Sequence, residues 1–295
     1  MFKRPSGNED DERSRARLAA RGLPPEAERR TERQPEGGGA FVSTLNAREF
    51  ALVASDDVAP LGVVTGSSVY HVGWQWTPLY ESRELASVTQ AERQVRMRAL
   101  SRLQQEAARM DAHGVIDVRF GKRDLGREVL EFTATGTAIR LTQGQPPPRP
   151  FLCTLSAGEF WTLRRAGYRP CGVALGVCAF YHVASIPLRN LRYSRREGQI
   201  GRRQMSGMEY AEYSEAIQFV RRTTMDRLES EARQGLAEGV IGLRLDQSIG
   251  PPPPDDNQNK YRRYDLMIRF TALGTAITPH RDRWPLLDYA VPLDC

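Results

Sequence analysis

The segment Phe132-Thr-Ala-Thr-Gly-Thr-Ala-Ile139 recurs later in this 295-residue chain as Phe270-Thr-Ala-Leu-Gly-Thr-Ala-Ile277, and this repetition indicates the architecture. Other segments on either side of it also recur in the same order. They are Phe41–Leu45 with Phe151–Leu155, Gly62–Gly66 with Gly172–Gly176, Tyr70–Val72 with Tyr181–Val183, and Arg102–Phe120 with Arg227–Leu245. Repeats that keep their order indicate an internal duplication. We therefore predict that the chain carries the same small domain twice.

Each copy has the pattern of a strand followed by a long helix. The runs Val63–Val72 and Val173–Val183 are β-branched and punctuated by glycine, which is typical of strands. In the next segment of each copy, apolar residues recur at helical spacing and so share one face. They are Leu100, Leu103, Ala107 and Met110, and then Ile217, Val220, Leu228 and Ala232. We expect Gly114 and Gly239 to end these helices in the left-handed conformation.

Two further strands follow each helix. Apolar residues alternate with other residues, which predicts that they share one face of a strand. They are Ile116, Val118 and Phe120, and then Ile241, Leu243 and Leu245. A hairpin leads to the last strand, where Gly136 and Gly274 are expected to let the helix approach the sheet. The predicted class is α+β, with two β-α-β-β units, each a helix on an antiparallel sheet with an extra amino-terminal strand or arm.

The predicted organisation has five parts. They are a disordered charged tail at 1–40, a first domain at 41–142, a Pro-rich linker at 143–150, a second domain at 151–279 and an apolar carboxy-terminal tail at 280–295. The first tail cannot bury enough apolar surface to offset its chain entropy. The linker is polyproline-like, so we expect it to space the domains semi-rigidly. The last tail must dock on the chain or bind a protein partner.

Composition indicates a soluble protein. Apolar residues make up 40% of the chain, which is enough for real cores. Four cysteines are too few for a disulfide framework and fit reduced thiols in the cytoplasm. No signal peptide or membrane-spanning run is present in the sequence. We therefore predict a cytoplasmic protein with no membrane span.

The repeated blocks resemble the YbjQ-like family of domains, which carries a heavy-metal-binding label. The resemblance rests on Gly62–Gly66, Gly114–Val118 and Gly136–Ile139, and the second copy repeats these segments less faithfully at 172–176, 239–243 and 274–277. It implies two tandem dodecin-like, two-layer domains that assemble into rings, which are pentamers in the family. The family usually has a Gly-Ala-Asp-Ala type turn after the helix, whereas this chain has His113-Gly114 and Glu238-Gly239 there. An odd ring also cannot be filled evenly by chains that each supply two units.

The metal label directs attention to the strand at 173–183. Cys178 and His182 fall on one side of that strand and Cys171 on the other, and a thiolate with an imidazole would suit zinc or copper. The first copy offers only His71, which recurs as His182 at the same repeat position. The alternative is that the cysteines pack like alanine and that the histidines are structural. We expect no cofactor, with a bound metal as the lesser alternative.

The basic excess of the chain is concentrated in a loop before the second helix. The formal net charge is +6, and the arginines of this loop are Arg192, Arg195, Arg196, Arg202 and Arg203. Arginine with an aromatic residue could contact an acidic partner, and a solvated loop has the same composition. A local basic loop is a weaker signal than a wholly basic face, so we do not expect nucleic-acid binding.

The sequence carries no recognised catalytic motif. The spacing of Gly62 and Gly66 lies on a predicted strand and does not open a helix, so it does not form a phosphate loop. We expect a non-catalytic, homo-oligomer-forming assembly or interaction protein. The alternatives are a small-ligand or heavy-metal-binding module and, third, an enzyme of unrecognised type.

Overall fold

The computed structural model describes residues 22–23, 27, 41–54, 57–71, 81–126, 129–186, 188, 209–252, 264–280 and 284–289. These residues form four helices and two four-stranded sheets, which confirms the α+β class. The elements in chain order are α3 (Ala47–Ala54), β1 (Val58–His71), β2 (Arg83–Glu84), α4 (Ala86–Arg109), β3 (Gly114–Asp124), β4 (Val129–Leu141), β5 (Phe151–Leu152), α5 (Ala157–Arg165), β6 (Tyr168–His182), α8 (Ala211–Gln234), β7 (Gly239–Gly250) and β8 (Leu266–Pro279). Most of the predicted tail at 1–40 lies outside the described residues, as does the tip of the last hairpin.

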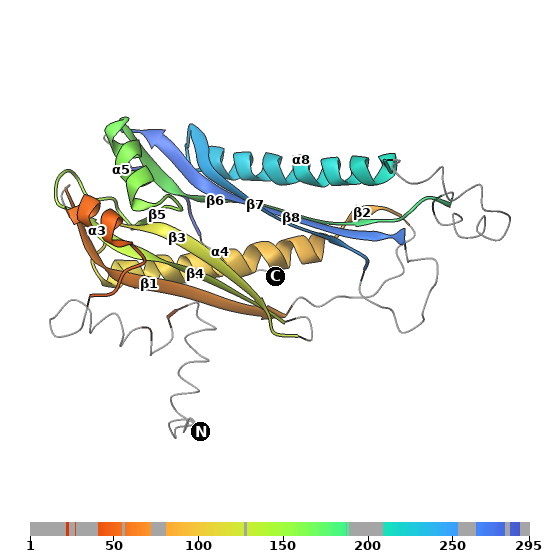
Figure 1. The fold of residues 1–295 in the computed structure, drawn as a ribbon, viewed down its shortest axis with the longest axis horizontal. Coiled ribbons are helices and arrows are strands. Elements are labelled where there is room, and N and C mark those ends of the chain that lie inside the picture. The colour runs from red at the N-terminus through yellow and green to blue at the C-terminus, as the bar shows by residue number, and fades with distance from the viewer. Residues whose placement is uncertain are drawn as a thin grey trace, which may run out of the picture.

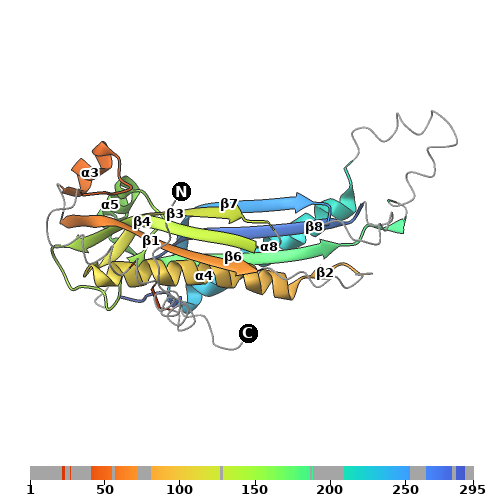
Figure 2. The same cartoon turned by 90° about the horizontal axis from the view of Figure 1, so that it is seen from below.

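Each sheet contains an edge strand from the other half of the chain. The first sheet has the order β1-β4-β3-β5 and the second has β2-β6-β8-β7. Thus β2 leaves the first half to pair with β6, and β5 begins the second half but pairs with β3. Figure 2 shows β2 running from the start of α4 beside the end of β6. The two halves are therefore interlocked.

The strands of the two sheets pair in equivalent registers. Gly62 lies opposite Ala138 in the first sheet, and Gly172 lies opposite Ala276 in the second. Both pairings shift at a bulge just before the glycine. The recurrence of a bulge at the same place indicates that the repeated sequence folds in the same way in each half.

A second bulge changes the face of the strand after each long helix. The β3–β4 register shifts between Ile116 and Arg119, and Asp117 has φ 54°. Ile116 consequently packs with Phe151, whereas Val118 belongs to the main core. The expectation that Ile116, Val118 and Phe120 share one face is therefore wrong, because one extra residue reverses the alternation.

Each long helix approaches its sheet most closely at a glycine within a strand, Gly66 of β1 and Gly176 of β6. A Cβ atom at Gly66 would overlap the carbonyl oxygen of Ala99 in α4, and one at Gly176 would overlap that of Thr224 in α8. The expectation that Gly136 admits the helix is wrong. A Cβ atom there would lie 2.7 Å from Cγ1 of Val115 in the neighbouring strand. Gly274 is likewise placed, 2.5 Å from Cγ1 of Val240.

The left-handed residues that end the long helices are not glycines. Asp111 has φ 51° after α4, and Leu236 has φ 55° after α8. The prediction for Gly114 and Gly239 is therefore wrong, because β3 and β7 already begin at these two residues. Gly114 is needed instead because the ring of Phe151 lies directly against it.

One main core joins the two halves. Helix α4 packs along β1 and also contacts β6, while α8 covers the outer face of the second sheet (Figure 1). The short helices α3 and α5 contact each other at one end of the molecule. The buried residues of the main core come from both halves; they include Val64, Leu100, Leu103, Val115, Phe132, Leu152, Val173, Leu175 and Leu228. Among the helices that the structure describes, none has both the length and the apolar composition that a membrane-spanning segment requires.

The described part of the carboxy-terminal tail docks on the chain itself. The amide of Leu287 donates to the carbonyl of Cys171 at 2.9 Å, and the hydroxyl of Tyr289 accepts from the amide of Val173 at 2.6 Å. Trp284 stacks on Phe151 with ring centroids 5.5 Å apart. These contacts cover the apolar side chains of the tail, so they lend no support to a partner site there.

Candidate functional site

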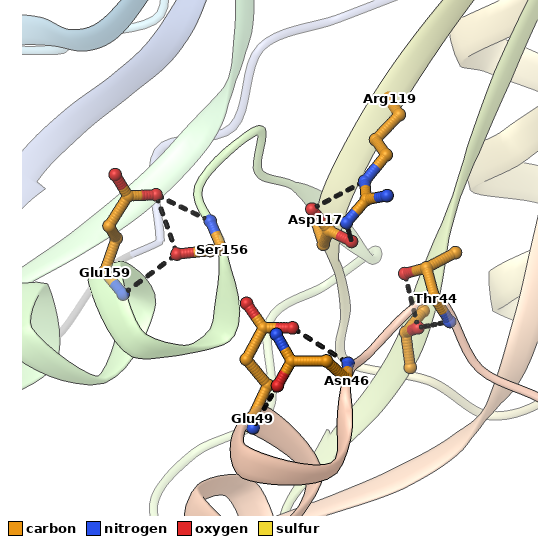
Figure 3. A network of polar contacts seen from close by, with 8 residues as sticks. Thr44, Asn46, Glu49, Asp117, Arg119, Ser156 and Glu159 are labelled. Carbon is orange, nitrogen blue, oxygen red and sulfur yellow. Dashed lines mark hydrogen bonds and ion pairs between the residues drawn. The ribbon is translucent and has the colours of Figure 1, made fainter.

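An arm and a short helix stand at the beginning of each half. In both, the helix begins with a capping box, in which two residues satisfy each other's free amides. The amide of Asn46 donates to Glu49 and that of Glu49 donates back to Asn46, at 3.0 and 2.9 Å. Ser156 and Glu159 make the same exchange (Figure 3). Capping fixes the direction in which each arm leaves its helix.

Each arm is anchored to the last strand of its own half by two threonines. The amide of Thr44 donates to the hydroxyl of Thr137 at 2.9 Å, and the two hydroxyls are 2.9 Å apart. Thr154 and Thr275 make the same two contacts at 2.8 Å. The two arms therefore have the same local geometry.

The second arm extends the first sheet. Phe151 and Leu152 pair in parallel with Gly114 and Val115. The bulge in β3 turns two amides outward, and they donate to the arm: Val118 to Cys153 at 3.0 Å, and Asp117 to Leu155 at 2.9 Å. The amide of Cys153 in turn donates to the carbonyl of Val115 at 2.9 Å. The bulge therefore shapes this edge to receive the arm.

The first arm has the same pattern but lies at the surface. Phe41 is 48% exposed and Val42 is 53% exposed, whereas the matching Phe151 and Leu152 are 1% and 0% exposed. Two adjacent apolar residues are thus exposed in a segment whose counterpart is buried, which makes the first arm a candidate interaction site.

A second junction lies where β2 and α4 border β6. The amide of Leu85 donates to the carbonyl of Ala179 at 2.8 Å, and the amide of Ala179 donates to the hydroxyl of Thr89 at 2.9 Å. Arg227 binds both carboxylate oxygens of Glu84 at 2.7 and 2.9 Å. These hydrogen bonds lower the pKa of Glu84. The first half therefore holds the edge of the second sheet by backbone bonds and an ion pair.

A buried carboxylate also joins the halves. Glu92 in α4 forms ion pairs with Arg96, with Lys122 at 3.4 Å and with Arg269 of β8 at 3.7 Å. Burial alone would raise its pKa, but these cations outweigh that effect and hold the pKa below its ordinary value. The cluster is a structural bridge between α4, β3 and β8.

The candidate metal ligands lie apart. Cys171 belongs to the main core and Cys178 packs beneath α8 with Val220. Burial raises the pKa of both thiols to about 11, so both are protonated at neutral pH. In the described ranges, no three His, Cys, Asp or Glu residues are grouped to hold a metal ion. The donors that the structure describes do not fit a bound heavy metal.

The two candidate histidines do not occupy equivalent positions. His71 lies opposite Val129, and the matching place in the second sheet belongs to Tyr181, so the expected equivalence of His71 and His182 is wrong by one residue. Nδ1 of His182 lies 3.3 Å from the Ser82 hydroxyl and the ring packs against Tyr213. Burial lowers the pKa of His182. Its contacts are those of a structural histidine.

The remaining candidates concern the basic loop. Arg192, Arg195, Arg196, Arg202 and Arg203 lie outside the described residues. Sequence reasoning missed the short helices α3 and α5, although the spacing of Asn46 with Glu49 and of Ser156 with Glu159 is a capping signal. It also missed the pairing of Phe151 with β3, because no local pattern indicates which edge an arm will join.

Comparison with known proteins places these features in a family. Residues 58–142 match the family model described as "Putative heavy-metal-binding". The chain is 34% identical over 256 residues to the encapsulin nanocompartment protein Rv1762c of Mycobacterium tuberculosis (strain ATCC 25618 / H37Rv), a match covering 84% of this chain and 93% of that protein. It is also 35% identical over 89 residues to a UPF0145 protein of Fervidobacterium nodosum (strain ATCC 35602 / DSM 5306 / Rt17-B1), covering 28% of this chain and 82% of that protein. No solved structure matches the chain.

Proposed function

The chain belongs to the same family as the encapsulin nanocompartment protein Rv1762c, and we propose that it is a non-catalytic protein that assembles into a homo-oligomer. The observation that carries this proposal is the contrast between its two arms. Phe151 is buried where its arm extends a sheet, whereas Phe41, in a matching arm, is exposed within a single chain. The name of the relative, a nanocompartment protein, supports an assembly role.

We also propose that both halves are YbjQ-like domains of dodecin-like type. The family model covers residues 58–142, which lie in the first half. Support for the second half comes from its registers and bulges, since Gly172 and Gly242 stand where Gly62 and Asp117 stand in the first. The domain limits at 41–142 and 151–279 remain predictions.

The absence of catalysis is part of the proposal, and two features support it. The carboxylates of Glu84 and Glu92 form ion pairs with Arg227 and Arg269 of the other half. The thiol of Cys153 is fully buried, and burial raises its pKa to about 12, which removes its nucleophilic form at neutral pH. A cytoplasmic location remains an expectation.

Light scattering after size exclusion tests the assembly proposal on the full chain. We expect a mass at least twice that of one chain at micromolar concentration. The mass of a single chain at every concentration tested would contradict the proposal. Elemental analysis of protein purified without added metal tests the metal alternative, for which the described residues give no support.

A further inference from the structure

We propose that copies of this chain join head to tail, by adding the arm Phe41–Leu45 of one copy to the outer edge of β7 in the next. The contact repeats between chains the one that Phe151–Leu155 makes with β3 inside the chain. This inference rests on the proposed self-assembly and assigns the surface that produces it.

The edge of β7 has the shape that receives an arm in β3. Its register with β8 shifts between Ile241 and Arg244, and Gly242 has φ 63°, as Asp117 has φ 54° in β3. The amides of Gly242 and Leu243 therefore correspond to the two that β3 turns outward to its arm. Among the strands that the structure describes, β7 ends its sheet, with β8 as its neighbour. An edge of this kind is a template for strand addition.

A groove beside β7 can receive the side chains of the arm. This groove of about 290 Å³ lies between α8 and β7, with Glu229, Arg233 and Glu238 among its polar residues, and its apolar lining includes Met225, Leu228, Ala232, Val240 and Leu243. The matching residues of the first half are Leu100, Leu103, Ala107, Val115 and Val118, and all of them are buried in one cluster with Leu152 of the arm. Val42 is the counterpart of Leu152.

Gly239 provides a second point of fit. At the matching Gly114, a Cβ atom would overlap the ring of Phe151. At Gly239, a Cβ atom would meet only Cγ1 of Ile277, at 4.0 Å, so the space above this glycine is open. The ring of Phe41, which is exposed in its own chain, would cover it. The donor and the acceptor are thus complementary in sequence and in shape.

A second junction closes at the same interface. Arg102 donates to the carbonyl of Ser67 as Arg227 donates to that of Val177. Arg227 also holds Glu84, but no carboxylate of the described part of the chain forms an ion pair with Arg102. The counterpart of Glu84 in the second half is Glu209, directly before Tyr210, the N-cap of α8.

The two junctions agree in direction. The copy that accepts the arm at β7 also presents Glu209, and the copy that gives the arm also presents Arg102 beside the outer edge of β1. This edge ends the first sheet, and Val69 on it is exposed. Because donor and acceptor are different surfaces, the contact is heterologous and generates a ring or a filament.

A disulfide trap tests the contact on the full chain. Leu152 and Val115 are Cα partners within the chain, so Val42 and Val240 of adjacent copies would be partners too. In a Cys295→Ser background, mild oxidation of the Val42→Cys/Val240→Cys protein should produce a ladder of covalent multimers on a non-reducing gel. Each single-cysteine variant should produce none. A folded double variant that assembles but yields no ladder would overturn the inference.

A charge on the arm provides an independent test. Val42→Asp should reduce the light-scattering mass to that of one chain, with an unchanged circular dichroism spectrum, because Val42 is 53% exposed in its own chain. The matched control is Leu125→Asp, an exposed apolar residue in the β3–β4 hairpin, which should keep the mass of the wild type. Retention of that mass by Val42→Asp would overturn the inference and leave the proposed function intact. A wild-type protein of single-chain mass would overturn both.

Discussion

Arg227 binds both carboxylate oxygens of Glu84 and thereby fastens the segment before α4 to the second sheet. The same guanidinium donates to the carbonyl of Val177 at 2.7 Å, so one side chain links α8, β2 and β6. A bidentate pair of this kind fixes position as well as charge. It is one of several polar contacts between the two halves, with the ion pair of Glu92 and Arg269 as another.

Glu84→Gln should destabilise the protein by about 1 kcal/mol at pH 7, because the pair is partly exposed. The pKa of Glu84 is lowered in the folded state, so its contribution is present above its ordinary value of 4.5 and is lost as the pH falls through the folded pKa. Urea unfolding at several pH values measures the difference. A difference that grows on acidification below pH 4 would contradict this explanation.

The proposed counterpart of this pair can be tested by exchanging charges. Arg102→Glu and Glu209→Arg should each weaken assembly, because each places like charges at the contact between copies. The double variant should recover assembly, since the charges again attract. Sedimentation at matched concentrations measures the three proteins. A double variant no better than the weaker single variant would rule out this pairing.

Gly66→Ala and Gly176→Ala should each cost about 3 kcal/mol or more, because the new methyl group would overlap the backbone of the crossing helix. Gly250→Ala is the matched control, because no atom lies within 4 Å of a Cβ atom there. We expect it to change stability by about 0.5 kcal/mol or less. Thermal unfolding compares the three, and equal stability of Gly66→Ala and the control would show that α4 does not cross there.

Glu92→Gln should cost about 3 kcal/mol, because it leaves the buried guanidinium of Arg96 without its anion. The control is Glu229→Gln, which breaks an exposed helical pair with Arg233 and should cost about 0.5 kcal/mol or less. Denaturant unfolding at pH 7 measures both. Similar losses in the two variants would mean that the pair of Glu92 and Arg96 is not buried in the folded protein.

The β-branched runs at 63–72 and 173–183 lie almost entirely within β1 and β6, so the strands were predicted closely. The glycines at the helix crossings were not, because Gly66 and Gly176, rather than Gly136 and Gly274, lie against the helices. The bulge in β3 could not be predicted from its own sequence, because an aspartate such as Asp117 does not by itself indicate a left-handed backbone conformation. Gly242 at the same place in β7 was a signal, because glycine adopts this conformation at no steric cost.

The candidate site was harder to predict than the fold. The arms were recognised as repeats, but the difference between exposed Phe41 and buried Phe151 depends on which sheet edge each arm reaches. The pair of Glu84 and Arg227 joins residues far apart in the sequence, so no local spacing reveals it. The spacing of Cys178 and His182 suggested a metal site. In the folded chain Cys178 packs in an apolar cluster, and His182 contacts Ser82 and Tyr213.

In the proposed assembly, one arm and one β7 edge hold each pair of copies together. The most direct measurement is the native mass of a mixture of two variants, Val42→Asp with a damaged arm and Leu243→Asp with a damaged edge. We predict that each variant alone has the mass of one chain, and that the mixture forms a complex of two chains and nothing larger. A mixture that stays as single chains while the wild type assembles, or that forms larger complexes, would contradict the account.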